Sequence, residues 1–274
     1  MTNNFMCYPN WKEKALTFSY DDGNNKDRDL VALFNKYNVK GTFNLNSARF
    51  QENGAENNIS KNEVKDLYKG HEVAVHTVTH PRLELLPSNL ISKEIVDDKS
   101  TLEALSGTIV QGMAYPFGTY NDEVVEICDK AGIKYSRTVH STYNFDVTND
   151  WLRLPATCHH ADDKLFELAE RFVAKNPSQE RFKYTGWLFY VWGHSYEFRT
   201  EEDWIRMEGF VSMVANREDT WYATNIEIYE YVQAYRNLVY SQDASMVYNP
   251  SAIPVYMIHN GKKYVVNSGE TLTF

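Results

Sequence analysis

The sequence lacks long apolar runs and has few cysteines. Its longest apolar stretch, Trp187–Trp192, is far shorter than the ~18 residues needed to cross a bilayer, which excludes a membrane span. Cys7, Cys128 and Cys158 have no pair spacing typical of a metal site, and their odd number argues against a disulfide framework. We therefore expect a reducing compartment.

A secretory signal and an excess of positive charge are also missing. Residues 1–14 begin with no basic region and contain no apolar one, which predicts a cytoplasmic location. The 28 Lys and Arg against 37 Asp and Glu give a net charge of −9, which repels phosphate backbones and argues against nucleic acid as a partner. At 43% hydrophobic and 24% charged residues, the composition is typical of a folded globular protein.

Strand-like and helix-like segments alternate along the first 240 residues. The predicted strands are Ala15–Tyr20, Lys40–Leu45, Glu72–Val75, Met113–Pro116, Tyr135–Val139, Trp187–Trp192 and Trp221–Ala223. The predicted helices are Asp27–Tyr37, Lys61–Lys69, Asn89–Leu105, Asp122–Ala131, Lys164–Lys175, Glu202–Ala215 and Ile226–Leu238. This α/β alternation implies a parallel sheet, and about seven units favour a closed barrel, with an open doubly wound sheet as the alternative.

Two local signals add detail. Ser60 and Glu63 have the spacing of a capping box, which predicts a helix start. After residue 240 the pattern changes to short strands and turns, and Asn260-Gly261 predicts a hairpin. We therefore expect a catalytic barrel over residues 1–240 and a β-rich extension over 241–274 that packs on the barrel or on a second chain.

Two adjacent carboxylates, Asp21 and Asp22, follow the predicted strand Ala15–Tyr20 and precede Gly23. At the C-terminal end of a barrel strand they repel each other, and a bound cation or a shared proton offsets this repulsion. The position indicates a site. The alternative is a solvated Asp-Asp-Gly turn, because Asp and Gly both favour turns.

Two histidines, His76 and His80, follow the predicted strand Glu72–Val75. In an extended chain they would lie ~13 Å apart, too far to share a metal ion. In a helical turn, which Pro81 would end, they lie ~6 Å apart and can share one. With one carboxylate they form a facial set that suits zinc, ferrous iron or another divalent ion; the alternative is two unrelated histidines.

Four segments in a fixed order resemble the polysaccharide deacetylases, carbohydrate esterase family four. They are Asp21-Asp22-Gly23, His76-x-x-x-His80, Tyr115-Pro116-Phe117-Gly118 and Leu188–His194. An ordered set is far more specific than one motif. The resemblance covers residues 14–240. It implies a distorted (β/α) barrel of about seven parallel strands, one divalent metal at the C-terminal ends of the strands, and removal of N- or O-acetyl groups from sugars.

The resemblance implies roles for single residues. Asp22, His76 and His80 would bind the metal, with zinc expected first and cobalt, nickel, manganese or iron as alternatives. Asp21 would be the base that takes a proton from the attacking water. His194, which can be charged near neutral pH, would be the acid that protonates the departing amine, although a hydrogen-bonded core histidine is the alternative.

Other residues would surround the acetyl group. By the resemblance, the Phe117 amide would be an oxyanion donor, presented by a tight turn that follows Tyr115 and begins at Pro116. Leu188 and Trp192 would form the wall of the acetyl pocket. The alternative for all five residues is ordinary packing.

The family commonly has an arginine where this sequence has Ala114. Arg153 is the predicted substitute, because a guanidinium lowers the pKa of Asp21 and holds it in place; a solvated surface arginine is the alternative. Residues 141–163 are long for a connection and predict a binding loop. Within it, Cys158–Asp163 indicate a substrate-contacting rim rather than a second metal cluster, because consecutive histidines converge poorly on one ion and no companion Cys pair is present.

The predicted function is metal-dependent removal of acetyl groups, N-acetyl first, from an acetylated amino-sugar polysaccharide or oligosaccharide. Two alternatives remain: a hydrolase of amide or cyclic imide C–N bonds on the same scaffold, and a carbohydrate-binding relative without catalysis. The presence of both Asp21 and His194 argues against the last, because binding requires neither base nor acid. Candidate sugar-stacking aromatics are Tyr143, Phe145, Trp151 and Tyr196. The oligomeric state is not indicated.

Overall fold

The computed structural model describes residues 4–50, 57–180 and 183–274. Its largest sheet is parallel, with the strand order β7-β6-β5-β4-β3-β2-β9-β8 and with β10 beside β2. The strands are β2 (Lys14–Asp21), β3 (Gly41–Leu45), β4 (Glu72–Val75), β5 (Gly112–Ala114), β6 (Tyr135–Ser141), β7 (Leu154–Ala156), β8 (Cys158–His159), β9 (Trp187–His194) and β10 (Thr220–Tyr222). All seven predicted strands are present within a few residues.

The segment that contains β7 and β8 closes the sheet into a barrel. β7 pairs with β6 at one edge, and β8 pairs with β9 at the other. Between them, the Thr157 N–H donates to the Tyr190 carbonyl at 2.8 Å. The barrel prediction is therefore confirmed, but this segment, absent from the predicted strands, closes the ring. The predicted last strand, β10, instead pairs with the first residues of β2.

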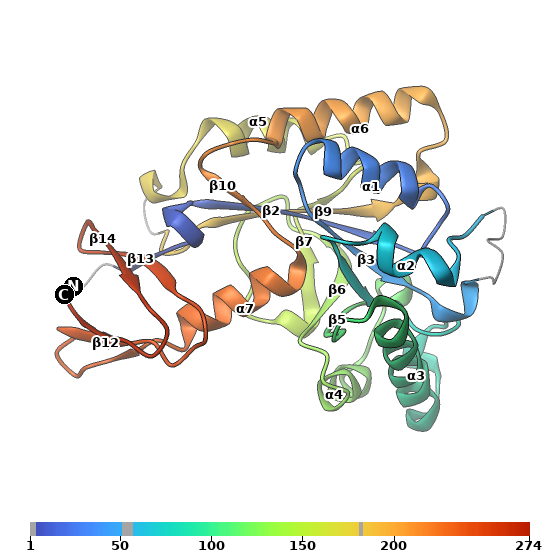
Figure 1. The fold of residues 1–274 in the computed structure, drawn as a ribbon, viewed down its shortest axis with the longest axis horizontal. Helices are drawn as coiled ribbons and strands as arrows, with labels where there is room; N and C mark the ends of the chain where they lie inside the picture. The colour runs from blue at the N-terminus through green and yellow to red at the C-terminus, as the bar shows by residue number, and fades with distance from the viewer. Residues whose placement is uncertain (1–3, 51–56, 181–182) are drawn as a thin grey trace.

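Helices cover the outside of the barrel. They are α1 (Asp27–Lys36), α2 (Val64–Leu67), α3 (Ser88–Ser106), α4 (Asp122–Lys130), α5 (Leu165–Ala174), α6 (Glu201–Val214) and α7 (Asn225–Arg236). In Figure 1, α1, α5 and α6 lie on one side of β2 and β9, and α3 and α4 lie on the other. The Ser60–Glu63 capping box is confirmed, but the predicted helix Lys61–Lys69 is divided into a 3-10 turn and the short α2.

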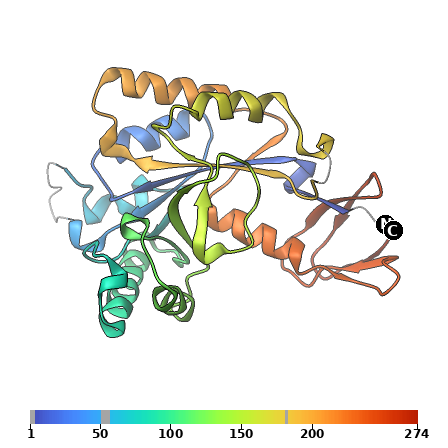
Figure 2. The same ribbon diagram turned by 180° about the vertical axis from the view of Figure 1, so that it is seen from behind.

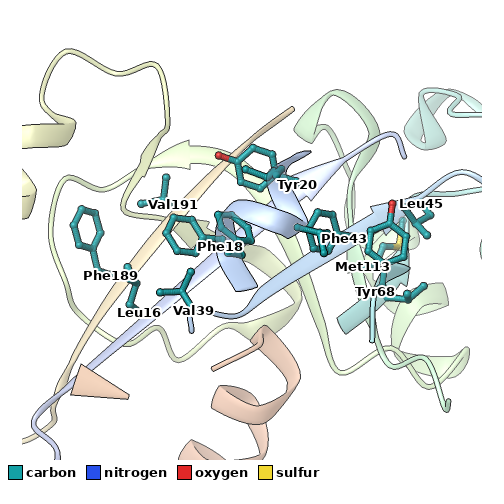
Figure 3. Packing of buried hydrophobic residues seen from close by; sticks show 14 of the residues in the cluster. Leu16, Phe18, Tyr20, Val39, Phe43, Leu45, Tyr68, Met113, Phe189 and Val191 are labelled. Atoms are coloured by element: carbon teal, nitrogen blue, oxygen red, sulfur yellow. The ribbon is translucent and has the colours of Figure 1, made fainter. Parts of the chain in front are cut away.

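The two faces of β2 differ in chemistry because side chains alternate along a strand. Leu16, Phe18 and Tyr20 point outward into the apolar core, where Phe18 stacks on Phe34 with ring centroids 4.5 Å apart (Figure 3). The intervening residues are polar and buried. Thr17 Oγ1 donates to Asn225 Oδ1 at 2.8 Å, for example. Thr17, Ser19 and Asp21 thus form a buried polar row along the inner face of β2.

The C-terminal extension forms two small sheets beyond α7, at the left end of Figure 1 and the right end of Figure 2. One sheet joins β1 (Asn4–Cys7), β13 (Val255–His259) and β14 (Lys262–Val266), and the other joins β11 (Val239–Tyr240), β12 (Met246–Tyr248) and β15 (Thr271–Thr273). The Asn260-Gly261 hairpin is confirmed, with both residues at the positive φ of such turns.

The extension packs on the barrel through α7. The Tyr231 hydroxyl accepts from the Tyr256 N–H at 2.9 Å and donates to the Cys7 carbonyl at 2.8 Å. The strand β1 belongs to the first 240 residues in sequence but completes a sheet of the extension. The division of the chain into a catalytic domain, residues 1–240, and an extension, residues 241–274, therefore stays a prediction. None of the described helices is long and apolar enough to cross a membrane.

Candidate active site

Four strand ends deliver the candidate residues to one end of the barrel. Asp21 ends β2, His76 follows β4, Phe117 lies in the turn after β5, and His194 ends β9. Parallel strands in a barrel present their C-terminal ends on the same face, where active sites of such barrels are found. Residues far apart in the sequence therefore meet there.

Asp22, His76 and His80 form one cluster. The Asp22 Oδ1 atom lies 3.8 Å from His76 Nε2 and 3.8 Å from His80 Nε2. Ligand atoms bound to one zinc ion at ~2.1 Å lie at most ~4.2 Å apart, so these distances suit a shared ion. The chain converges through a bend at Thr77 and His80, with φ values of 69° and 60°, rather than through the helical turn expected from the spacing.

The protonation of the cluster also suits a cation. His76 Nδ1 lies 2.8 Å from the Ala114 carbonyl, which can only accept, so the ring proton is on Nδ1 and the Nε2 lone pair points toward Asp22. Burial lowers the pKa of His76, and burial lowers the pKa of His80 to about 4, which keeps both rings in the neutral form that binds metals. Asp22 Oδ1 is buried and accepts no hydrogen bond within the described residues, although Arg49 Nη1 lies 2.7 Å away. Two nitrogen lone pairs and this oxygen fit a divalent ion.

Four of the eleven described non-glycine residues with positive φ lie at the candidate site. Asp22, Thr77, His80 and Phe117 have φ values of 81°, 69°, 60° and 59°, in the left-handed region that non-glycine residues rarely adopt. Each such residue costs ~1–3 kcal/mol, and such strain is typical of functional sites. Asp22, His80 and Phe117 are thus motif residues that also have a strained backbone.

Asp21 is buried beside the cluster and held by two donors. Asn44 Nδ2 donates to its Oδ1 at 2.8 Å, and the Arg137 guanidinium donates to its Oδ2 in a buried ion pair. Burial acts to raise the pKa of Asp21, but the charges of Arg137, His76 and His194 outweigh it and hold that pKa below its usual value. Asp21 is therefore an ionised carboxylate fixed in orientation.

The predicted pairing of Arg153 with Asp21 is wrong. Arg153 binds Asp122 at 2.7 Å and Asp150 at 3.0 Å, on the outside of the barrel. Arg137, on β6, instead binds Asp21, the role expected of the family arginine whose position is occupied here by Ala114. Arg137 is the one cation within the predicted strand Tyr135–Val139. Because a cation buried in a sheet must be paired with an opposite charge, the sequence could have indicated it.

The turn after β5, Pro116–Gly118, contacts the cluster through Phe117. The N–H groups of Gly118 and Thr119 donate to carbonyls within the turn, and that of Phe117 takes no part in these bonds. The Phe117 ring is half exposed and lies 4.6 Å from the His80 ring. Pro116 is buried at the start of the turn. Tyr115 is buried with its hydroxyl bonded to the Leu152 carbonyl at 2.8 Å, so its side chain has a packing role and does not line the site.

Of the two residues predicted to wall the acetyl pocket, Trp192 lies at the site and Leu188 does not. The Arg137 guanidinium stacks over the Trp192 ring at 4.4 Å. Leu188 is paired with Ala15 at the other end of the barrel, six residues and therefore ~20 Å from His194 along β9. The prediction for Leu188 is wrong because the motif Leu188–His194 is an extended strand, so its first residue lies far from its last.

His194 lies beside Asp21 and belongs to a second cluster. Its Nε2 is 3.9 Å from Asp21 Oδ2, and its Nδ1 is 3.2 Å from Glu197 Oε2. Burial acts to lower the pKa of His194, but the hydrogen bond to Glu197 and the charge of Asp21 outweigh it and raise that pKa above its usual value. His159 and His160 also approach Glu197. The sequence analysis assigned no role to Glu197, although its spacing of three from His194 was visible.

The aromatic candidates divide by exposure. Tyr196 is 38% exposed and lies 4.8 Å from the His194 ring, and Tyr143 is 37% exposed. Phe145 and Trp151 are buried in apolar clusters, so the expectation that they stack on sugars is wrong.

Comparison with known proteins matches residues 9–136 to the family model described as polysaccharide deacetylase. The chain is 31% identical over 118 residues to the peptidoglycan-N-acetylmuramic acid deacetylase PdaC of Bacillus subtilis, covering 42% of this chain and 24% of PdaC. It is 29% identical over 141 residues to chitin deacetylase 1 of Cryptococcus neoformans var. grubii, covering 48% of this chain and 28% of that protein. The chain thus spans less than half the length of these curated relatives.

Among solved structures, a CE4 family pseudoenzyme from Bacillus anthracis superposes with a TM-score of 0.53, covering 82% of this chain and 68% of that one at 21% identity. At this identity the likeness concerns the fold. The matched family segment contains Asp21 and the three residues of the first cluster, Asp22, His76 and His80, but it ends before Arg137 and His194.

Proposed function

We propose that the chain is a divalent-metal-dependent hydrolase that removes acetyl groups, N-acetyl first, from an amino-sugar glycan. The match of residues 9–136 to the polysaccharide deacetylase family and the two deacetylase relatives support this proposal. The main support for the proposal is that three residues able to bind a cation lie next to a carboxylate that is free to act as a base. Asp22, His76 and His80 converge within 4.8 Å, and Asp21 lies next to them without belonging to the set. Metal-assisted hydrolysis needs both elements.

Asp22, His76 and His80 would hold the ion, with zinc expected first for a set of two nitrogens and one oxygen. A divalent ion there supplies Lewis acidity, which lowers the pKa of water and polarises a carbonyl oxygen. Cobalt, nickel, manganese and iron remain alternatives for the same ligands.

The other residues act on protons and charge. Asp21 is kept ionised by Arg137 and Asn44, so it can take a proton from attacking water. The Phe117 amide would donate to the oxyanion that develops on the acetyl carbonyl. His194, whose pKa is raised, would deliver a proton to the departing amine.

The substrate class follows from the family and from the relatives. PdaC is a deacetylase of N-acetylmuramic acid in peptidoglycan by its name, and the second relative is a chitin deacetylase. We infer an acetylated amino-sugar oligomer or polymer as the partner. The exposed rings of Phe117 and Tyr196 lie 4.6 and 4.8 Å from the rings of His80 and His194, so both are candidates to stack on a sugar.

Acetate release tests the proposal. The metal-free protein, reloaded with zinc, would be assayed on N-acetylglucosamine oligomers, peptidoglycan, acetylated xylan and small cyclic imides, with a chelator control. We expect chelator-sensitive release from an N-acetylated glycan and at least a ~100-fold loss in the Asp21→Asn variant with its metal retained. Hydrolysis of imides alone, or no loss in Asp21→Asn, would overturn the proposal.

A further inference from the structure

Three imidazoles surround the Glu197 carboxylate. Its Oε2 lies 3.1 Å from His159 Nε2, 3.4 Å from His160 Nε2 and 3.2 Å from His194 Nδ1. The same oxygen accepts the His194 backbone N–H at 2.9 Å. Burial acts to raise the pKa of Glu197, but hydrogen bonds from His159 and His194 outweigh it and hold that pKa well below the usual range. Glu197 is therefore an ionised acceptor.

The neighbours of His159 and His160 place their protons on the atoms that face Glu197. His159 Nδ1 accepts the Ala161 backbone N–H at 3.1 Å, so the proton of the neutral ring is on Nε2. His160 Nδ1 lies 3.1 Å from the Tyr20 hydroxyl, which can donate to it and leave a proton on Nε2. His159 therefore serves as a donor that holds Glu197, and His160 Nε2 lies 3.4 Å from the same oxygen.

The packing around this group is specific. A Cβ atom at Gly193 would lie 2.0 Å from His160 Nδ1, so only glycine at that position of β9 leaves room for the ring. Arg206 donates to the carbonyls of His160 and Asp162 at 2.6 and 2.9 Å, which fixes the segment that carries the two histidines. Glu197 thus has a built environment.

From this arrangement we propose that Glu197 is a positioning residue that keeps a proton on His194 Nδ1 and reserves His194 Nε2 for the reacting group. Glu197 can only accept, so the atom of His194 that faces it carries the proton. His194 Nε2 then points toward Asp21, 3.9 Å away, at the mouth of the first cluster. The proposal rests on the proposed function only where it assigns that Nε2 atom the delivery of a proton.

The same geometry argues against a second metal site, although His159, His194 and Glu197 offer a ligand set within 4.8 Å. Metal binding through His159 Nε2 would move its proton to Nδ1, against the Ala161 N–H. The Glu197 oxygen would also have to release the donors that it now accepts. The carboxylates of Asp21 and Glu197 lie within 3.9 Å of the His194 ring nitrogens, the charge of Asp22 also acts on the ring, and Trp192 and Tyr196 flank it.

Nitrogen NMR of the zinc-loaded protein tests the proposal. Long-range ¹H–¹⁵N correlations of ¹⁵N-histidine report which ring nitrogen carries the proton, and a His194→Asn variant assigns the signal. The variants would be Glu197→Met, which removes the acceptor, and Glu63→Met as its control. Glu63 occupies the equivalent position in the Ser60 capping box, and its carboxylate bonds to the Ser60 N–H and to Arg28 rather than to a histidine.

We expect neutral His194 to carry its proton on Nδ1 in the wild type and in Glu63→Met, and to shift it to Nε2 in Glu197→Met. With a glycan substrate, kcat should fall ~100-fold in Glu197→Met with little change in KM, and Glu197→Asp should restore part of it. A wild-type signal with the proton on Nε2 overturns the proposal, and so does an unchanged tautomer in Glu197→Met. If Glu197→Met does not fold, the wild-type tautomer alone decides. Absence of deacetylase activity would sink the proposed function, whereas the tautomer measurement would still stand.

Discussion

The molecule contains two clusters of nearly the same composition at the same end of the barrel. Each combines two histidines and one carboxylate whose ligand atoms lie within 4.8 Å of one another: Asp22, His76 and His80 in the first, and His159, His194 and Glu197 in the second. The difference lies in the hydrogen bonds behind the rings. His76 Nδ1 donates to a carbonyl, whereas His159 Nδ1 accepts an amide N–H.

Because of that difference, the first cluster presents lone pairs to its centre and the second presents protons. In the first, a lone pair points inward and Asp22 Oδ1 accepts no hydrogen bond among the described residues, so the cluster offers electron pairs to a cation. In the second, protons point inward and Glu197 accepts them, so the cluster is saturated without a metal. Residue types alone would have assigned both clusters the same role.

Removal of one histidine from each cluster should have the largest and most unequal effect. We expect His76→Ala to lose nearly all bound zinc and at least ~1000-fold of activity, because it deletes a ligand. His159→Ala should keep about one zinc ion per chain, because its Nε2 is a proton donor. Elemental analysis after dialysis measures both. Equal metal loss, or a second tightly bound ion in the wild type, would contradict the distinction.

Arg137 supports the carboxylate that lies between the clusters. Asp21 Oδ2 is 3.9 Å from His76 Nε2 and 3.9 Å from His194 Nε2. Arg137→Met leaves this buried charge unpaired, which should lower the free energy of unfolding by ~3–5 kcal/mol at pH 7. Arg153→Met, which removes only exposed ion pairs, should cost ~0–1 kcal/mol. Urea unfolding of both variants checks this, and similar losses would refute the assignment of Arg137.

His160, which lies beside the second cluster, should make the free energy of unfolding depend on pH. Burial lowers the pKa of His160 to about 3 in the folded chain, against ~6.5 when unfolded. Between these values the unfolded state binds the additional proton, so stability is present above pH ~6.5 and is lost as the pH falls toward 3. In His160→Asn the unfolding free energy should depend less on pH, by up to ~1.4 kcal/mol per pH unit. Denaturation series at pH 7, 6, 5 and 4 measure this. An unchanged slope would argue against it, with the exposed His140→Asn as control.

Each cluster also carries one exposed aromatic ring. Phe117 meets His80 edge to face, with ring centroids 4.6 Å apart, and the Tyr196 ring lies 4.8 Å from that of His194. Phe117→Ala and Tyr196→Ala should each raise KM for a glycan oligomer ~5-fold, which corresponds to a lost stacking contact of ~1 kcal/mol. Tyr143→Ala, an equally exposed ring bonded to Asp162, should leave KM unchanged. Steady-state kinetics would contradict this if all three behaved alike.

Much of the fold was predictable because local pattern and tertiary role agree. The alternation of strands and helices, the Ser60 capping box and the Asn260-Gly261 hairpin depend on neighbouring residues and are confirmed. The closing segment Leu154–His159 was missed because proline and polar residues interrupt it, and its pairing is with strands distant in sequence.

The sequence predicted which residue types form the site better than it predicted which residues contact one another. The motif aspartates and histidines meet as the motif order predicts, whereas Arg153 and Leu188 were misplaced. Position along a motif does not say which end of a strand a side chain occupies. A gap such as Ala114 likewise does not say which distant cation fills it.

The sequence by itself determined the succession of elements and the supply of carboxylates and imidazoles at the ends of strands, since both depend on local periodicity and chain order. Only the tertiary structure decided that Arg137 binds Asp21, that Glu197 binds His194, and which nitrogen of each histidine carries the proton. A ring proton follows the nearest donor or acceptor. For His76 that atom is the Ala114 carbonyl, which lies 38 residues further along the chain.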